Sequence, residues 1–315
     1  MPKKKPAKAT KVKKSSTVAR RSLKEDFPLY LMFLPALIWI AVFRLAPMPG
    51  LAIAFTDYNI FHGFWASDWV GLEHFRVLFT RPQFLRVLSN TIQISLLRLI
   101  FVFPLSVILA LMLNEIRRMV FKRTVQTIIY LPFFVSIVVV HGIFVNLLST
   151  QGGIVNEVIG FFGGNPINFY TNQWFRFVLL LTDAYQGAGW GTIVYLAALA
   201  GVDVELYEAA QIDGAGRLRQ LFSITLPSIM PIIMLMLVLR IGGILNAGTE
   251  QILVMYNPTV YATADVLGTL IFREGLGRAQ FGFTTAVGMF ESVISFVLLL
   301  GANFIASKCF KRGVW

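Results

Sequence analysis

Residues 208–227 read EAAQIDGAGRLRQLFSITLP and form a polar island between two long apolar runs. Just ahead of it, Asp203 stands where a helix start favours a negative charge. Gly214 then interrupts the predicted helix, and Arg217 opens a second short helix that runs into the next apolar run. Two interpretations fit this pattern. The island is either an amphipathic linker between two membrane spans, or a docking surface for a partner on the same side of the membrane.

The composition is that of an integral membrane protein. Hydrophobic residues make up 56% of the chain, charged residues only 14%, and the mean hydropathy is +0.69. A soluble domain carries about 25% charged residues. The net charge is +12, of which +8 lies in residues 1–26. This Lys-, Pro- and Ser-rich leader has too little apolar surface to fold, so we interpret it as disordered, cytoplasmic and in contact with anionic lipid headgroups rather than nucleic acid.

A membrane-spanning helix needs about 20 mostly apolar residues. The sequence contains six such stretches, and the fourth is diluted by three glycines. We therefore predict an all-α polytopic protein: a six-span domain over 27–308, a loop at 201–227 between spans four and five, and a tail at 309–315. The predicted spans are Pro28–Ala46, Thr91–Leu113, Val125–Leu148, Phe175–Leu199, Ser228–Leu245 and Phe283–Ala306.

The distribution of Lys and Arg predicts the orientation. With the N-terminus inside, the inner segments carry nineteen of these residues and the outer loops only five. Inner loops are enriched in Lys and Arg. Both termini, and the island at 208–227, are therefore predicted to be cytoplasmic.

Charged residues also occur within the predicted spans. A charge at a helix centre costs about 2.5–3.5 kcal/mol on insertion scales, so it normally faces a cavity or a partner. Two interpretations stay open: structural ion pairs (Arg240–Glu291 or Arg98–Asp183), or a hydrophilic path for a polar solute. The candidate path residues, which include two aromatic residues able to stack on sugar rings, are Arg98, Asp183, Trp190, Tyr195, Arg240 and Glu291.

Signatures of catalysis are missing from the sequence. There is no GxxxxGK[S/T] phosphate-binding loop, and the three histidines and the single Cys309 lack metal-ligand spacing. We therefore expect no catalytic residues, no metal site and no cofactor on this chain. Energy for any active transport then comes from a partner protein or from an ion gradient.

The island resembles the cytoplasmic loop of permeases from binding-protein-dependent ABC importers. That family pattern is E-A-A, three residues, G, nine residues, then I-x-L-P, and the island matches it without departure. The ATPase-coupling positions implied by the resemblance are Glu208, Ala209, Ala210, Asp213, Gly214, Ile224, Leu226 and Pro227.

The rest of the chain, over about 27–308, is similar to the maltose-type sugar branch of these permeases. The similar stretches are Trp69–Phe75, Asn90–Asn114, Tyr130–Pro132 and Gly189–Gly201. Within that branch, Glu250–Gly275 is similar to permeases for complex oligo- and polysaccharides of the aldouronate and alginate type.

The resemblance implies a type I ABC importer permease fold in the bacterial inner membrane, with a cytoplasmic coupling helix. It implies four kinds of partner: a second permease, two ATP-binding cassette subunits that bind ATP and Mg, an extracytoplasmic solute-binding protein, and an oligo- or polysaccharide of uronate type. Two alternatives are an ion-gradient secondary transporter of a polar solute and a membrane scaffold. The scaffold leaves the intramembrane charges unexplained, and the secondary transporter predicts inverted repeats.

Overall fold

The computed structural model describes the backbone of residues 23–310 and the side chains of residues 27–308. The chain divides into two units, residues 1–51 and 52–315. Only the last four residues of the predicted leader, and the first two of the predicted tail, lie within the described backbone. The disorder predicted for the leader therefore concerns residues outside it.

The described part of the first unit, residues 23–51, is mostly helical and apolar. α1 (Leu23–Ile40) continues through a π-helical turn (Ala41–Leu45) and then a 3-10 helix (Met48–Phe55). The stretch Phe27–Phe55 is long and apolar enough to cross a membrane. The helical course therefore continues past Ala46, the predicted end of this span, and beyond the prolines at 47 and 49.

Residues 52–310 are helical throughout their regular parts, and no β-strand is assigned to them apart from one isolated bridge pair. The long helices alternate with short 3-10 and π-helical turns. The α-helices are α2 (Glu73–Thr80), α3 (Pro82–Leu97), α4 (Phe103–Glu115), α5 (Met119–Tyr130), α6 (Ile137–Leu148), α7 (Ile154–Phe161), α8 (Phe175–Ala200), α9 (Val204–Ile212), α10 (Arg217–Gln220), α11 (Leu226–Gly242), α12 (Thr249–Met255), α13 (Tyr261–Ala264), α14 (Leu267–Ile271) and α15 (Phe281–Phe310).

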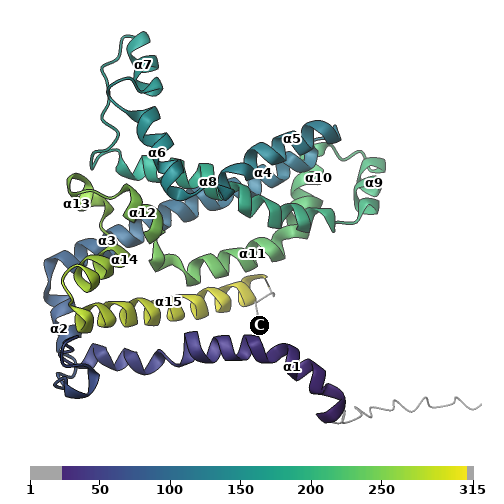
Figure 1. Ribbon diagram of the computed structural model, residues 1–315. Helices are drawn as coiled ribbons and strands as arrows, with labels where there is room; N and C mark the ends of the chain where they lie inside the picture. Colours follow the sequence, from purple (N-terminus) through teal and green to yellow (C-terminus); the bar gives the residue numbers. More distant parts are fainter. Residues whose placement is uncertain (1–22, 311–315) are drawn as a thin grey trace, which may run out of the picture. The chain divides into compact units, whose positions relative to one another are not determined.

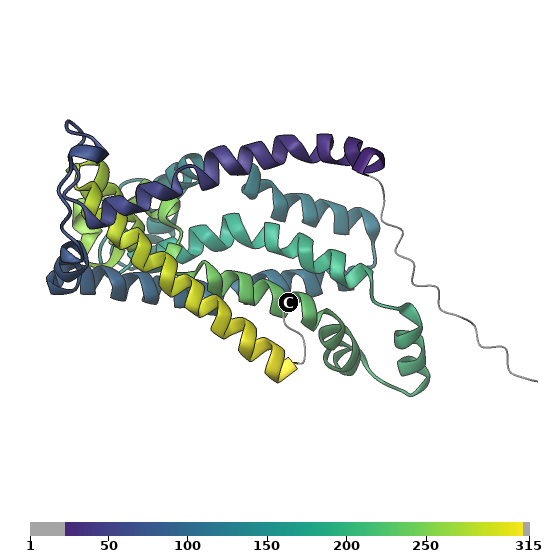
Figure 2. The ribbon, with the colours of Figure 1, turned by 90° about the horizontal axis from the view of Figure 1, so that it is seen from below.

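The centre of this second unit is a bundle. α8 packs against α4 and α11, and α11 packs against α15, as Figures 1 and 2 show. Tyr195 of α8 and Ile229 of α11 are buried in this bundle together with Val107 and Ala110 of α4. Figure 1 places α9 and α10 at one end of the bundle and α2, α13 and α14 at the other. The two predicted sides of the membrane thus correspond to opposite ends of the bundle.

The glycines of α8 allow close approach of its neighbours. A Cβ added to Gly189 would overlap the carbonyl oxygen of Ile129 in α5, and one added to Gly191 would lie 2.6 Å from Oγ of Ser106 in α4. Small residues let helix backbones approach in this way. The residues that lower the hydropathy of the fourth predicted span therefore serve its packing.

We expect Gly189→Ala to destabilise the protein, because the added methyl group meets a backbone atom that cannot rotate away. Overpacking of this kind costs about 1–3 kcal/mol. The measurement is the thermal unfolding midpoint of the purified protein in detergent. Gly288→Ala in α15 is the matched control, since nothing lies within 4 Å of its added Cβ. Equal midpoints for the two variants would contradict the packing argument.

The third predicted span, Val125–Leu148, is broken rather than continuous. The segments Met119–Phe134 and Ile137–Leu148 meet at 104°. Pro132 lies at the break, and the carbonyl of Val135 there accepts a hydrogen bond of 2.8 Å from the Gln186 side chain of α8. Irregular backbone at membrane depth requires such an internal partner. The apolar sequence pattern continues through the break, and so it did not reveal it.

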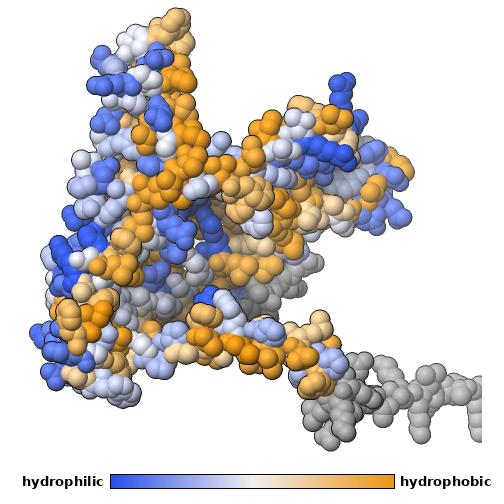
Figure 3. Space-filling model, viewed as in Figure 1, coloured by the Kyte–Doolittle hydropathy of each residue, from blue (hydrophilic) through white to orange (hydrophobic). Residues whose placement is uncertain are grey.

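Four helices among the described residues are long and apolar enough to cross a membrane, or five if the broken pair is one span. α8, with 26 residues, has the length but is not among them. The count of six spans therefore stays a prediction, while the all-helical, membrane-type fold is confirmed. In Figure 3 hydrophobic side chains cover much of α5 to α7, and hydrophilic ones gather near α2 and α9.

Candidate functional site

The polar island begins with a capped helix. The Asp203 side chain accepts a hydrogen bond of 3.0 Å from the backbone N–H of Glu205 at the start of α9. α9 ends in a tight turn in which Ala215 N–H donates to the Ala210 carbonyl at 2.8 Å, and Gly214 has a φ of +75°. Residues with a side chain avoid this left-handed region. The helix start and the break at Gly214 predicted from the sequence are both confirmed.

The second half of the island is tied back to the first. The Gln220 side chain donates a hydrogen bond of 2.8 Å to the Ala215 carbonyl. The Tyr207 hydroxyl of α9 lies 2.9 Å from Oγ1 of Thr225, which is buried just before α11. The two short helices therefore form one connected projection at the end of α8 and α11.

The surface of this projection is open. Glu208 is exposed and has no ion pair among the described residues, and Ile212, Leu218 and Phe222 are 87%, 73% and 65% exposed. Contiguous exposed apolar groups with polar neighbours are typical of interaction surfaces. Of the other predicted coupling residues, the four exposed ones are Ala209, Asp213, Gly214 and Pro227. The three half-buried ones are Ala210, Ile224 and Leu226.

A cavity of about 770 Å³ lies within the bundle, where α3, α8 and α11 meet the turn that follows α11. Figure 3 shows hydrophilic surface in the hollow between these elements. Apolar side chains supply part of the wall. The polar part of the lining consists of Ser95, Arg98, Asp183, Gln186, Arg240, Asn246, Glu250 and Gln251.

Arg98 lies in the wall of this cavity and is only 5% exposed. Its Nε is 3.4 Å from Oδ2 of Asp183, and its Nη2 donates a hydrogen bond to Oε1 of Gln251. Gln251 in turn donates to Oγ1 of Thr182 at 2.6 Å and to the Leu179 carbonyl at 3.2 Å. The Arg98–Asp183 ion pair considered from the sequence is therefore formed, and the charge of Arg98 is neutralised within the chain.

Arg240 differs from Arg98. Its side chain lines the cavity, is exposed, and forms no ion pair among the described residues. The considered Arg240–Glu291 pair is not formed, because the register of α11 against α15 separates the two residues. A Cβ on Gly242 would lie 2.8 Å from Leu299, so Glu291 is eight residues, about 12 Å of helix rise, away from this contact along α15.

The two candidate aromatic residues lie outside the residues that line the cavity. Trp190 stacks on Phe133 with ring centroids 4.7 Å apart, and Tyr195 is 2% exposed and packs edge-to-face on Phe103. Both contacts are packing contacts within the bundle. A role for Trp190, Tyr195 or Glu291 in a substrate path stays a prediction.

Several lining residues are not evident from the sequence. Asn246, Glu250 and Gln251 follow directly after the fifth predicted span, where hydropathy places them in an outer loop rather than in a cavity. The polar run NAGTEQ at 246–251 immediately after an apolar span is the available signal. Gln186 does not stand out in the sequence, because it is a single uncharged amide within a predicted span.

The turn after α11 has an unusual backbone. Ala247 and Gly248 both lie in the left-handed region, with φ values of +50° and +68°. For a residue with a side chain this costs about 1–2 kcal/mol. Ala247 is also buried, at 4% exposure. Such strain persists only where the surroundings fix the backbone, and it is concentrated at functional sites.

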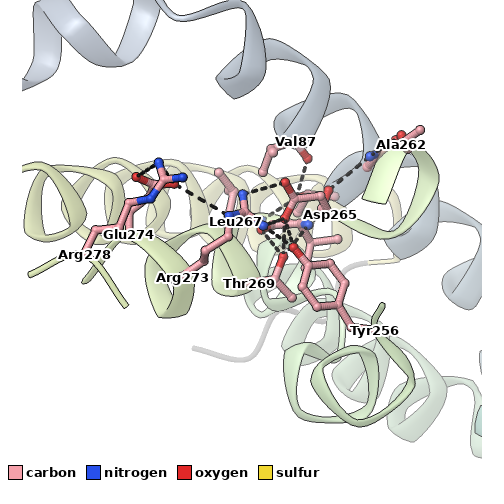
Figure 4. A network of polar contacts seen from close by, with 12 residues as sticks. Val87, Tyr256, Ala262, Asp265, Leu267, Thr269, Arg273, Glu274 and Arg278 are labelled. Carbon is pink, nitrogen blue, oxygen red and sulfur yellow. Dashed lines mark hydrogen bonds and ion pairs between the residues drawn. The ribbon is translucent and has the colours of Figure 1, made fainter. Parts of the chain in front are cut away.

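A network of polar contacts fixes the end of the bundle opposite α9 and α10 (Figure 4). Asp265 is 1% exposed and accepts two hydrogen bonds from Arg273, at 2.9 and 2.8 Å, with further bonds from Tyr256 at 3.0 Å and Thr269 at 2.7 Å. The hydrogen bonds to Asp265 raise the pKa of Arg273, and burial together with Asp265 raises the pKa of Tyr256. Arg273 and Tyr256 therefore keep their charge states at physiological pH.

A second buried carboxylate extends the network. Glu274 is 1% exposed, lies 3.6 Å from Nε of Arg273 and accepts hydrogen bonds of 3.1 and 3.2 Å from Arg278. On the other side, the Asn90 side chain of α3 donates to the carbonyls of Ala262 and Asp265. The network thus joins α3 to residues 256–278, which lie between the fifth and sixth predicted spans.

Replacing Arg273 by Met is expected to destabilise this region strongly, because Asp265 would then be a buried carboxylate without its cation. Loss of one partner from a buried ion pair costs about 3–5 kcal/mol. The measurement is the unfolding midpoint, or hydrogen exchange of residues 256–278. Arg86→Met in α3 is the matched control, since Arg86 is exposed and unpaired within the described residues. If Arg273→Met lowers the unfolding midpoint no more than Arg86→Met does, the stabilising role of the Arg273–Asp265 pair is contradicted.

Comparison with known proteins identifies the family. Residues 102–310 match the model for the binding-protein-dependent transport system inner membrane component. The chain is 46% identical, over 91% of its length and 90% of the relative, to the polygalacturonan/rhamnogalacturonan transport system permease protein YteP of Bacillus subtilis, and 43% identical, over 93% of each, to Protein LplB of the same organism.

A solved structure has a closely similar fold. A chain of a bacterial alginate ABC transporter, in complex with an alginate pentasaccharide-bound periplasmic protein, is 42% identical, with a TM-score of 0.86 over 93% of this chain and 98% of that one. The resemblance to ABC importer permeases, and the corresponding fold, are confirmed by these matches. This chain belongs to the family of binding-protein-dependent transport system inner membrane components.

Proposed function

We propose that this chain is one of two membrane subunits of an ATP-driven ABC importer for acidic oligo- or polysaccharides. The observation that carries the proposal is the island at 208–227, which projects from the bundle with an exposed Glu208 and exposed apolar side chains. Glu208 has no basic residue at i+4 in its own helix, where Ile212 stands, so its partner is expected on another chain.

The island then acts as the coupling helix. ATP and Mg bind to two partner ATPase subunits, and this chain carries no cofactor. Closure of the ATPases on ATP moves the islands of both permeases, and the bundles rock as rigid bodies between inward- and outward-open states. The hydrogen bonds from Gln220 and Tyr207 support this role, because they make the projection rigid enough to transmit force to α8 and α11.

The proposed arrangement places both termini and the island in the cytoplasm, as the Lys and Arg distribution indicates. The opposite end of the bundle, with α2, α13, α14 and the Asp265 network, then faces the extracytoplasmic solute-binding protein. The second permease covers part of the apolar surface that the described residues leave exposed. The family assignment favours this importer over the ion-gradient transporter, and no feature of the described residues favours the latter.

Two observations support an acidic substrate. The relative YteP is named for polygalacturonan and rhamnogalacturonan, and a second neighbour with 41% identity is described as importing the acidic polysaccharide alginate. In the cavity, Arg240 offers a cation without an ion-pair partner among the described residues, whereas Arg98 is neutralised by Asp183. The electrostatic argument therefore rests on Arg240 rather than on an excess of arginines.

Affinity purification tests the assembly. A tagged copy of this chain, expressed from its native locus and extracted in mild detergent, is expected to retain an ATP-binding cassette protein and a second permease. Charge reversal at Glu208 is expected to release the ATPase but not the second permease, because the island contacts only the ATPase. Retention of the ATPase by a chain from which residues 208–220 are deleted would contradict the docking role.

A further inference from the structure

The turn 243–250 runs from the end of α11 into the first residues of α12 and presents two side chains to the cavity. Asn246 and Glu250 both line it, both are exposed, and neither side chain has a hydrogen-bond or ion-pair partner among residues 27–308. They face the same cavity as Arg240. Their directions depend on the backbone of the turn, which carries the two left-handed residues Ala247 and Gly248.

The backbone of this turn is fixed by side chains from neighbouring elements. Ser95 of α3 donates a hydrogen bond to the Ile244 carbonyl. Thr249 donates one of 2.7 Å to the Asn246 carbonyl. These bonds fix the turn at Ile244 and Asn246, and Gly248 is left to be fixed by another group.

That group is Arg98. A Cβ added to Gly248 would overlap Nη1 of Arg98, so the guanidinium occupies the place where a side chain at 248 would be. The same guanidinium donates to Gln251, near the start of α12. Arg98 therefore contacts the turn at its centre and just beyond its end.

The position of Arg98 is itself fixed by residues of α8 and α12. Asp183 lies 3.4 Å from its Nε, and Gln251 is anchored to the Leu179 carbonyl and the Thr182 hydroxyl of α8. With 5% of its surface exposed, Arg98 cannot bind a solute through its fork of donors without breaking these contacts. The planar guanidinium suits this bidentate role, and a lysine ammonium does not.

We propose that Arg98 is a positioning residue and not a solute ligand. It holds the turn 243–250 in the left-handed conformation that directs Asn246 and Glu250 into the cavity beside Arg240, and Gly248 is required because the guanidinium fills its side-chain space. Asn246 and Glu250 then contact the hydroxyl groups of the sugar, and so determine its selection. This inference rests on the proposed importer function.

The test is a double-mutant cycle in the complete importer, reconstituted with its solute-binding protein. Uptake of a uronate oligosaccharide is measured for Arg98→Gln, Gly248→Ala and the double variant, as KM for the loaded binding protein and as maximal rate. Each single change is expected to raise KM by about fivefold or more, and the double variant is expected to lie within about twofold of the worse single variant, because both act on one turn. If the KM of the double variant is instead raised by the product of the two single effects, the proposal is overturned.

Arg98→Lys separates positioning from solute binding. If Arg98 bound the solute by charge, lysine would retain most of the uptake; a positioning role predicts that Lys is as poor as Gln. Arg86→Lys in α3, an exposed arginine that does not line the cavity, is the matched control and is expected to retain uptake. Near-normal KM in Arg98→Lys would contradict the inference.

Thiol labelling of the purified chain tests the proposal even for variants that fail to assemble with the other importer subunits. With Cys309→Ser as background, Asn246→Cys reports the exposure of the turn to an aqueous thiol reagent in the purified chain. Ser95→Ala, which removes only one of the bonds to the turn, and Arg98→Lys are both expected to change the labelling rate by about threefold or more. An unchanged rate in both would refute positioning. Absence of uptake by the unmodified importer would instead refute the proposed function, since the labelling result does not depend on transport.

Discussion

Glu208→Lys is expected to abolish coupled uptake while the chain still inserts and assembles with its second permease. Glu208 is exposed and contributes nothing to the packing of the described chain, so its replacement should leave the fold intact. Reversing one charge of a desolvated pair at an interface costs about 2–5 kcal/mol, so uptake should fall by more than about tenfold. The measurement is ATP-driven uptake in proteoliposomes, recorded together with ATP hydrolysis.

Two controls separate docking from general effects. Glu115→Lys makes the same charge change at the exposed last residue of α4, on the predicted cytoplasmic side, and should leave uptake within about twofold, as usual for surface substitutions. Gly214→Asp and Gly214→Asn both fit the open space at φ +75° and differ in charge. Asp, but not Asn, is expected to uncouple hydrolysis from uptake. Normal coupled uptake in Glu208→Lys and Gly214→Asp would refute the docking role.

Arg240→Ala is expected to impair the uptake of acidic sugars selectively. Hydrogen bonds to a charged group contribute about 1.5–3 kcal/mol, so uptake of a uronate oligosaccharide should fall by about tenfold to a hundredfold. A neutral oligosaccharide of the same length lacks the carboxylate and serves as the internal control. The measurement is the ratio of the two uptake rates in the same proteoliposomes.

Arg240→Lys should preserve much of the uptake of the acidic sugar, since the charge remains in the cavity. Arg44→Ala, which removes an exposed arginine from the helix of the first unit, should leave the ratio unchanged. Unaltered transport of the acidic sugar by Arg240→Ala, with neutral sugars carried as well, would remove the argument for a carboxylate-binding arginine.

Features with a local cause could be predicted from the sequence. The start of α9 at Asp203 and the turn at Gly214 follow from helix capping and from the conformational freedom of glycine. The motif in residues 208–227 also indicates the family, because its residue types and spacing are all local to one short segment.

Features that depend on contacts between distant segments could not be predicted. Hydropathy does not show that the Gln186 side chain donates a hydrogen bond to the Val135 carbonyl at the break. Nor does it show that the register of α11 against α15 keeps Glu291 away from Arg240. The sequence offered Arg98–Asp183 and Arg240–Glu291 as equal candidates. Only the helix packing distinguishes the pair that forms from the pair that does not.

The most direct test of the central claim is uptake by the purified importer in proteoliposomes, with ATP, a proton gradient or a sodium gradient as the only energy source. We expect a uronate oligosaccharide to accumulate only when ATP and the loaded solute-binding protein are both present, and we expect this accumulation to be lost in Glu208→Lys. Accumulation driven by either ion gradient in the absence of ATP would contradict this expectation.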